Sequence, residues 1–164
     1  MDTPQNIVLS LLSNYVLMVT TVAWFLAQVI KVFYYYATDK EFNLMHFLEA
    51  GGMPSAHSAT VSALSISIGL VYGWDSPFFA IALVTALIVM YDATGVRREA
   101  GRQALLLNKI VEEIYASDGE KIKKLKELIG HTPLEVVAGA AIGIIIAFVS
   151  YGGLLALSFS NFLK

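Results

Sequence analysis

Two histidines of this chain stand at the starts of apolar segments, each behind a turn of small residues. His57 lies in Gly51-Gly52-Met53-Pro54-Ser55-Ala56-His57-Ser58-Ala59, and His131 lies in Gly130-His131-Thr132-Pro133. Unpaired backbone N–H groups and the positive end of the helix dipole make a helix start a favourable place for phosphate. One imidazole can attack phosphorus while a second protonates the leaving alkoxide. The pair therefore predicts phosphoryl chemistry.

Glu135 follows His131 by four residues, which places both side chains on one face if the helix already includes the histidine. The carboxylate would then orient the imidazole. A second interpretation is structural, because Thr132-Pro133-Leu134-Glu135 is also a capping box with proline at the first helical position. Capping explains Thr132 and Glu135, but it does not explain His131.

Basic residues near these segments could bind the oxygens of a phosphoryl group. Lys31, Arg97 and Arg98 supply the positive charge that such a transition state requires. The alternative is that they only set membrane orientation, as basic residues beside spans commonly do. Asp92 could hold one of the two arginines, coordinate a metal or end a helix, and we favour the first role.

The composition identifies the protein that must position these groups as an integral membrane protein. Of 164 residues, 57% are hydrophobic and 15% are charged, and the net charge is −2. Cysteine is absent, so disulfides and thiolate metal sites are excluded. This profile is too apolar for an ordinary soluble domain of the same length.

The apolar pattern predicts an all-α, polytopic membrane bundle that forms a single domain over residues 1–164. Length and composition favour about four spans, near residues 7–30, 58–72, 78–91 and 133–150. The tyrosine-rich stretch 32–50 is expected to lie at the interface without crossing. Residues 154–162 are too short to cross alone, so we expect a kink or a surface position after Tyr151-Gly152-Gly153.

Residues 92–132 hold most of the charge and are predicted to form a cytoplasmic segment with two short amphipathic helices. Apolar side chains follow helical spacing from Leu107 to Ile114 and again from Ile122 to Ile129. Within the last span, Gly139 and Gly143 form a small-xxx-small pattern, which permits close helix packing inside the protein or across a dimer.

The distribution of lysine and arginine favours an N-terminus outside and a chemical site facing the cytoplasm. Ten basic residues fall in the two inner loops of the four-span arrangement, whereas Lys164 is the one outside. The same topology collects residues that are distant in sequence at one membrane face: His57, Asp92, Arg97, Arg98 and His131.

Three blocks of the sequence resemble the divergent branch of the type 2 phosphatidic acid phosphatase and vanadium haloperoxidase superfamily. They are the Gly51–Ala59 block, Tyr91-Asp92-Ala93-Thr94-Gly95-Val96-Arg97-Arg98, and Leu128-Ile129-Gly130-His131-Thr132-Pro133. Their order and spacing match, and they cover most of the chain.

The resemblance implies a role for each matching residue. It implies that His131 is the nucleophile, Glu135 its orienting carboxylate and His57 the acid. Ser55 and Lys31 would contact phosphate, and no metal or other cofactor would be needed. Two positions differ from the wider superfamily, since Ala56 replaces a glycine and Glu135 stands where aspartate is usual.

These observations favour a metal-independent phosphoric monoester hydrolase that acts on a lipid or isoprenoid phosphate. One alternative is a non-catalytic protein that binds anionic lipid or phosphate. A metallophosphatase would instead use as ligands His57, Asp92, His131 and Glu135. A small transporter or channel subunit is the weakest alternative, because the polar residues gather at one face. The expected partners are membrane lipids, the lipid substrate and a second copy of the chain, with no role for nucleic acid.

Overall fold

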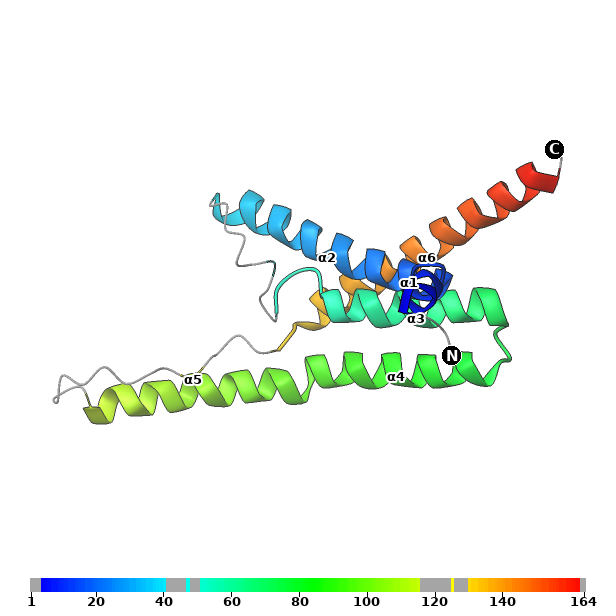
Figure 1. The fold of residues 1–164 in the computed structure, drawn as a ribbon. Coiled ribbons are helices and arrows are strands. Elements are labelled where there is room, and N and C mark those ends of the chain that lie inside the picture. Colours follow the sequence, from blue (N-terminus) through cyan, green and yellow to red (C-terminus); the bar gives the residue numbers. More distant parts are fainter. Residues whose placement is uncertain (1–3, 41–46, 48–50, 116–124, 126–129, 163–164) are drawn as a thin grey trace.

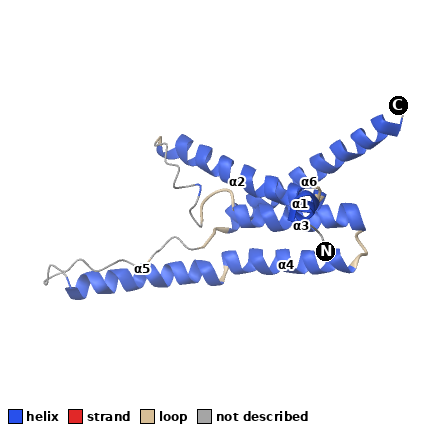
Figure 2. Cartoon of the chain, in the orientation of Figure 1, coloured by secondary structure: helices blue, strands red, loops and turns tan. Residues whose placement is uncertain are grey.

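The computed structural model describes residues 4–40, 47, 51–115, 125 and 130–162, and the regular structure in these ranges is entirely helical (Figures 1 and 2). The helices are α1 (Pro4–Leu12), α2 (Tyr15–Asp39), α3 (Ala56–Tyr72), α4 (Pro77–Thr94), α5 (Val96–Tyr115) and α6 (Pro133–Phe162). The prediction of an all-α membrane bundle is confirmed. The second amphipathic helix expected near Ile122 to Ile129 lies almost wholly outside the described residues.

The first crossing helix differs from the predicted span at residues 7–30. The chain breaks at Asn14, whose side-chain oxygen accepts the Leu17 N–H at 3.1 Å and starts α2 afresh. No glycine or proline interrupts α2. The helix ends at Lys40, which adopts a left-handed φ of 56°. The tyrosine-rich stretch assigned to the interface is therefore helical as far as Asp39, and the crossing segment is Tyr15–Thr38.

Small residues allow α3 to occupy the centre of the bundle, in contact with α2, α4 and α6. Its buried side chains are mostly alanine and serine, as at Ala59 and Ala63. At the crossing with α6, a Cβ on Gly139 would collide with the Ser55 carbonyl, and one on Gly143 with the Ala59 carbonyl. The small-xxx-small pattern thus packs within the protein, which removes one reason to expect a dimer.

Arg97 and Arg98 lie in the first turn of α5, directly after the junction with α4. α4 continues to Thr94, a single non-helical residue follows at Gly95, and α5 begins at Val96. The two helices form a long rod that extends past the rest of the bundle (Figure 1). The helical segment Pro77–Ile114 is 38 residues long and contains an apolar stretch long enough to cross a membrane, so the helix continues well beyond the predicted span at 78–91.

α6 is continuous through Gly152 and Gly153, so the kink predicted there is wrong. Nothing lies within 4 Å of a side chain built at either glycine, and no packing constraint forces the helix to bend. Within the described residues, three helical segments are long and apolar enough to cross a membrane, and the apolar α3, with 17 residues, is shorter. The four predicted spans therefore correspond to three long segments and one short central helix.

Candidate functional site

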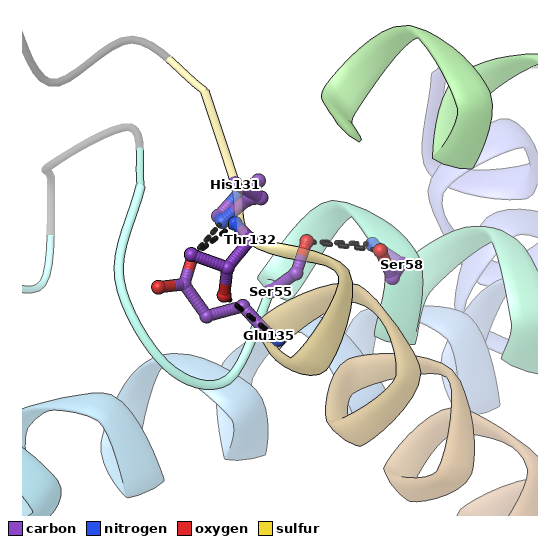
Figure 3. Close-up of polar contacts among 5 residues, drawn as sticks. All are labelled: Ser55, Ser58, His131, Thr132 and Glu135. Carbon is purple, nitrogen blue, oxygen red and sulfur yellow. Dashed lines mark hydrogen bonds and ion pairs between the residues drawn. The ribbon is translucent and has the colours of Figure 1, made fainter. Parts of the chain in front are cut away.

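The first turn of α6 holds a carboxylate between the histidine and the helix cap (Figure 3). Glu135 Oε2 lies 2.9 Å from His131 Nδ1 and 3.2 Å from the Thr132 backbone nitrogen, which donates to it. The Thr132 hydroxyl in turn accepts the Glu135 N–H at 3.3 Å. Both interpretations of this stretch are therefore present together, because one carboxylate completes the capping box and also contacts the imidazole.

His131 is held from two sides and is almost fully buried, with 5% of its side chain exposed. Its backbone N–H donates to the Ala93 carbonyl at the end of α4, over 3.0 Å. If Nδ1 donates its proton to Glu135, the lone pair of a neutral ring is on Nε2. The sequence spacing predicted this contact, and the structure adds the anchor on α4.

His57 lies beside His131, with 6.4 Å between the ring centroids. It occupies the first turn of α3, outside the three long crossing segments. The residue is partly exposed, yet burial of its ring lowers the pKa of His57 below the ordinary value, assisted by the nearby Arg97, His131 and Lys31. The ring is therefore mostly neutral at pH 7 when no anion is bound.

Asp92 and Arg97 form an ion pair at the junction of α4 and α5. Arg97 Nε donates to Asp92 Oδ2 at 2.6 Å, and both side chains are substantially exposed. Of the two arginines, Arg97 is the one whose charge lowers the pKa of His57. The backbone of Arg98 instead packs directly against Gly130, where no Cβ could be accommodated.

Lys31 and Ser55 are buried beside the histidines. Lys31 is 2% exposed on α2, and its charge contributes to the lowered pKa of His57. Ser55 is 0% exposed, and its hydroxyl accepts the Ser58 N–H at 3.3 Å as the cap of α3. Its backbone N–H donates to the Glu135 carbonyl at 3.0 Å. Ser55 thus joins the two histidine-bearing helices, while its contact with phosphate stays a prediction.

Sequence reasoning missed Tyr35, which packs against the turn before His57. A Cβ on Gly52 would meet the Tyr35 hydroxyl and ring, and Gly52 has a φ of 84° that disfavours other residues. Tyr35 follows Lys31 by four residues on α2, so helical spacing alone could have suggested that both face the same site. The three neighbouring tyrosines pointed instead to an interfacial belt.

The two carboxylates near the histidines each contact a neighbouring polar group. Asp92 contacts Arg97, and Glu135 contacts His131 and Thr132. Within the described part of the chain, no three histidine, aspartate or glutamate side chains gather closely enough to hold a metal ion. The four side chains named as ligands for the metallophosphatase alternative do not form such a group in this structure.

Comparison with known proteins agrees with the three sequence blocks. The family model described as the divergent PAP2 family matches residues 12–146. The uncharacterized membrane protein YuiD of Bacillus subtilis is 42% identical, over 86% of this chain and 96% of its own length. No solved structure matches the chain.

Proposed function

This chain belongs to the divergent PAP2 family of membrane proteins, and from that premise we propose that it removes phosphate from a lipid or isoprenoid phosphate. One observation carries the proposal. The Glu135 carboxylate contacts Nδ1 of His131, and a second histidine lies with its ring centroid 6.4 Å from that imidazole. This is the arrangement of an oriented nucleophile beside an acid.

In the proposed reaction, Nε2 of His131 attacks phosphorus and a nitrogen–phosphorus bond forms. The bond from phosphorus to the ester oxygen breaks, and the leaving alkoxide takes a proton from His57. Water then attacks the phosphohistidine and gives a proton back to His57, so that inorganic phosphate leaves and both rings are restored. Glu135 holds the tautomer of His131 and stabilises its positive charge during the first step.

Substrate binding would also favour the protonated form of His57 that the reaction needs. The lowered pKa leaves the free ring mostly neutral, but a phosphate with two negative charges beside it would raise that pKa. The positive charges of Lys31 and Arg97 would neutralise the equatorial oxygens as the bonds exchange. Ser55 would act indirectly, by fixing the start of α3 beside Glu135.

We place this site at the cytoplasmic face, with the N-terminus outside. The support is the distribution of basic residues in the sequence, which are concentrated in the two predicted inner loops, after Ile30 and between Arg97 and Pro133. Cysteines introduced singly at exposed positions, such as Ile114 near this face and Trp74 at the other, would test the orientation. Reaction of intact cells with an impermeant maleimide should label the Trp74 position and spare the Ile114 position.

The direct test is turnover by the purified chain on phosphatidate, lysophosphatidate, phosphatidylglycerophosphate and prenyl phosphates. We expect His57→Ala and His131→Ala each to lower kcat by about 10²-fold or more. Rapid acid-free quench should trap phosphate on His131, and turnover should resist chelators. Unchanged turnover in both variants would overturn the histidine mechanism.

Burial of the site supports a second candidate function, in which the protein binds an anionic lipid or phosphate without hydrolysis. Ser55 is fully buried and already caps α3, and Ala56, where the wider superfamily has glycine, is 4% exposed. Both features restrict close backbone approach by a phosphate. A saturable rise in the melting temperature of the chain with added phosphate, with no phosphohistidine and no turnover, would favour this candidate.

A further inference from the structure

An apolar groove opens between α4 and α6, close to the paired histidines. Its volume is about 620 Å³, and its walls are formed by Leu87, Ile88, Met90, Tyr91, Thr94, Pro133, Val136 and Val137. The Thr94 hydroxyl bonds back to the carbonyls of Met90 and Tyr91, both at 3.2 Å. The groove therefore offers apolar surface along its length.

One end of the groove reaches the residues that position His131. Thr94 follows Ala93, whose carbonyl accepts the His131 N–H. Pro133 follows His131 by two residues, and Val136 follows the orienting Glu135. The other end, at Leu87, lies about 10 Å along α4 at roughly 1.5 Å per residue, within the apolar segment that crosses the membrane.

We propose that this groove binds the hydrocarbon chain of a phosphate-bearing lipid. The placement of the phosphate rests on the proposed function, with the phosphate between His57 and His131 and the first part of the chain along α4. The substrate class is then a phosphomonoester whose flexible alkyl or isoprenyl chain begins within a few bonds of phosphorus. The remainder of the chain lies in the bilayer.

Two residues of the groove wall, Thr94 and Pro133, lie within two residues of Ala93 and His131, and this closeness to the polar site favours a lipid phosphate over other occupants. Water would find almost no polar partners on these walls. A second copy of a helix could cover the apolar walls, but it would bring nothing to the positively charged end beside His57 and Arg97. A lipid phosphate matches both ends, because its chain is apolar and its head is anionic.

A matched pair of isoleucines on α4 tests the groove by turnover. Ile88 lines the groove and is 63% exposed, whereas Ile81, two turns earlier, is 67% exposed and does not line it. Ile88→Trp should lower the ratio of kcat/KM for dodecyl phosphate to that for p-nitrophenyl phosphate by about tenfold or more. Ile81→Trp should leave the ratio unchanged. Equal ratios in the two variants would overturn the proposal.

A second measurement does not depend on hydrolysis. The full chain in detergent is irradiated with an alkyl phosphate that carries a diazirine in its chain, and the labelled peptides are mapped by mass spectrometry. Labelling should concentrate at residues 87–94 and 133–137, and the matching alcohol should label less there. If this labelling is found without turnover, the groove still binds the hydrocarbon chain but the proposed phosphatase activity is rejected. Equal labelling around Ile81 and Ile88 by both probes would reject the chain site, whether or not turnover occurs.

Discussion

At the crossing of α3 and α6, small residues bring two backbones into contact, whereas the rod of α4 and α5 carries its charged groups at an exposed junction. The crossing holds His57 and His131 through buried links such as the Ser55 N–H to Glu135 carbonyl bond. The rod supplies Asp92 and Arg97, whose side chains remain 36% and 46% exposed. The comparison teaches that buried packing fixes the positions of His57 and His131, whereas the charged side chains of the rod stay exposed beside them.

The largest expected effect comes from breaking the crossing itself. In Gly143→Val, the new Cβ would overlap the Ala59 carbonyl, and overpacking of this kind costs about 1–3 kcal/mol or more. We expect a lower melting temperature in detergent and loss of turnover. Gly153→Val is the matched control, because nothing lies within 4 Å of that position on the same helix. Equal melting temperatures in the two variants would show that the crossing is not tight.

The next effect separates orientation of His131 from helix capping. Glu135→Gln retains a residue that can complete a capping box but removes the carboxylate charge, so kcat should fall by about 10²-fold or more with little change in melting temperature. Thr132→Ala should lower the melting temperature, at a cost of about 1 kcal/mol in stability, with little change in kcat. If Thr132→Ala lowers kcat as much as Glu135→Gln, the carboxylate acts only through the cap.

A smaller change tests the turn that precedes His57. Gly52→Ala places a methyl group against Tyr35 and forces alanine into a left-handed φ, which costs roughly 1–2 kcal/mol. We expect about a tenfold loss in kcat/KM with the chain still folded. Adding Tyr35→Ala should restore part of the loss by making space. No recovery in the double variant would assign the whole effect to backbone strain.

The lowered pKa of His57 predicts the pH dependence. The acid must be protonated, so kcat/KM should fall as pH rises through a pKa below 6.5, and the optimum should lie on the acid side of neutrality. The unfolded chain binds this proton more tightly than the folded one, so stability should decrease as pH falls from about 6.5. His57→Gln should abolish both dependences. A fall in kcat/KM at higher pH that persists in His57→Gln would identify a different acid.

The smallest effects belong to the exposed rod. Arg97→Gln should change stability by less than about 1 kcal/mol, since exposed ion pairs contribute little, yet raise KM several-fold through lost charge near the site. Arg102→Gln is the matched control, because Arg102 pairs with Glu99 at the same 2.6 Å on the same helix. An equal rise in KM in both variants would mean that only the general charge of α5 matters.

Contacts within one stretch of chain could be predicted from the sequence, and contacts between distant stretches could not. The i, i+4 spacing predicted the His131 to Glu135 contact, and proximity in sequence favoured the Asp92 to Arg97 pair. Membrane topology also predicted correctly that the two histidines would meet. The Tyr35 to Gly52 contact depends on how α2 packs beside the turn, which no local pattern specifies.

The predicted helix boundaries were wrong where local sequence signals competed with tertiary context. Asn14 lies inside the predicted span at 7–30, yet its side chain starts a new helix. The Gly152-Gly153 pair is a typical breaker, but α6 runs through it, and nothing lies within 4 Å of a side chain built at either glycine. Hydropathy alone therefore gave the correct fold class with displaced ends.

The contact between Gly130 and the backbone at Arg98 places the chain that enters α6 across the junction of α4 and α5. Gly130 has no room for a side chain beside Arg98, and the N–H of the next residue, His131, donates to the Ala93 carbonyl on the other side of Gly95. The chain that enters α6 therefore contacts both helices of the rod. A change in the angle between α4 and α5 should shift the backbone of His131, and with it the imidazole.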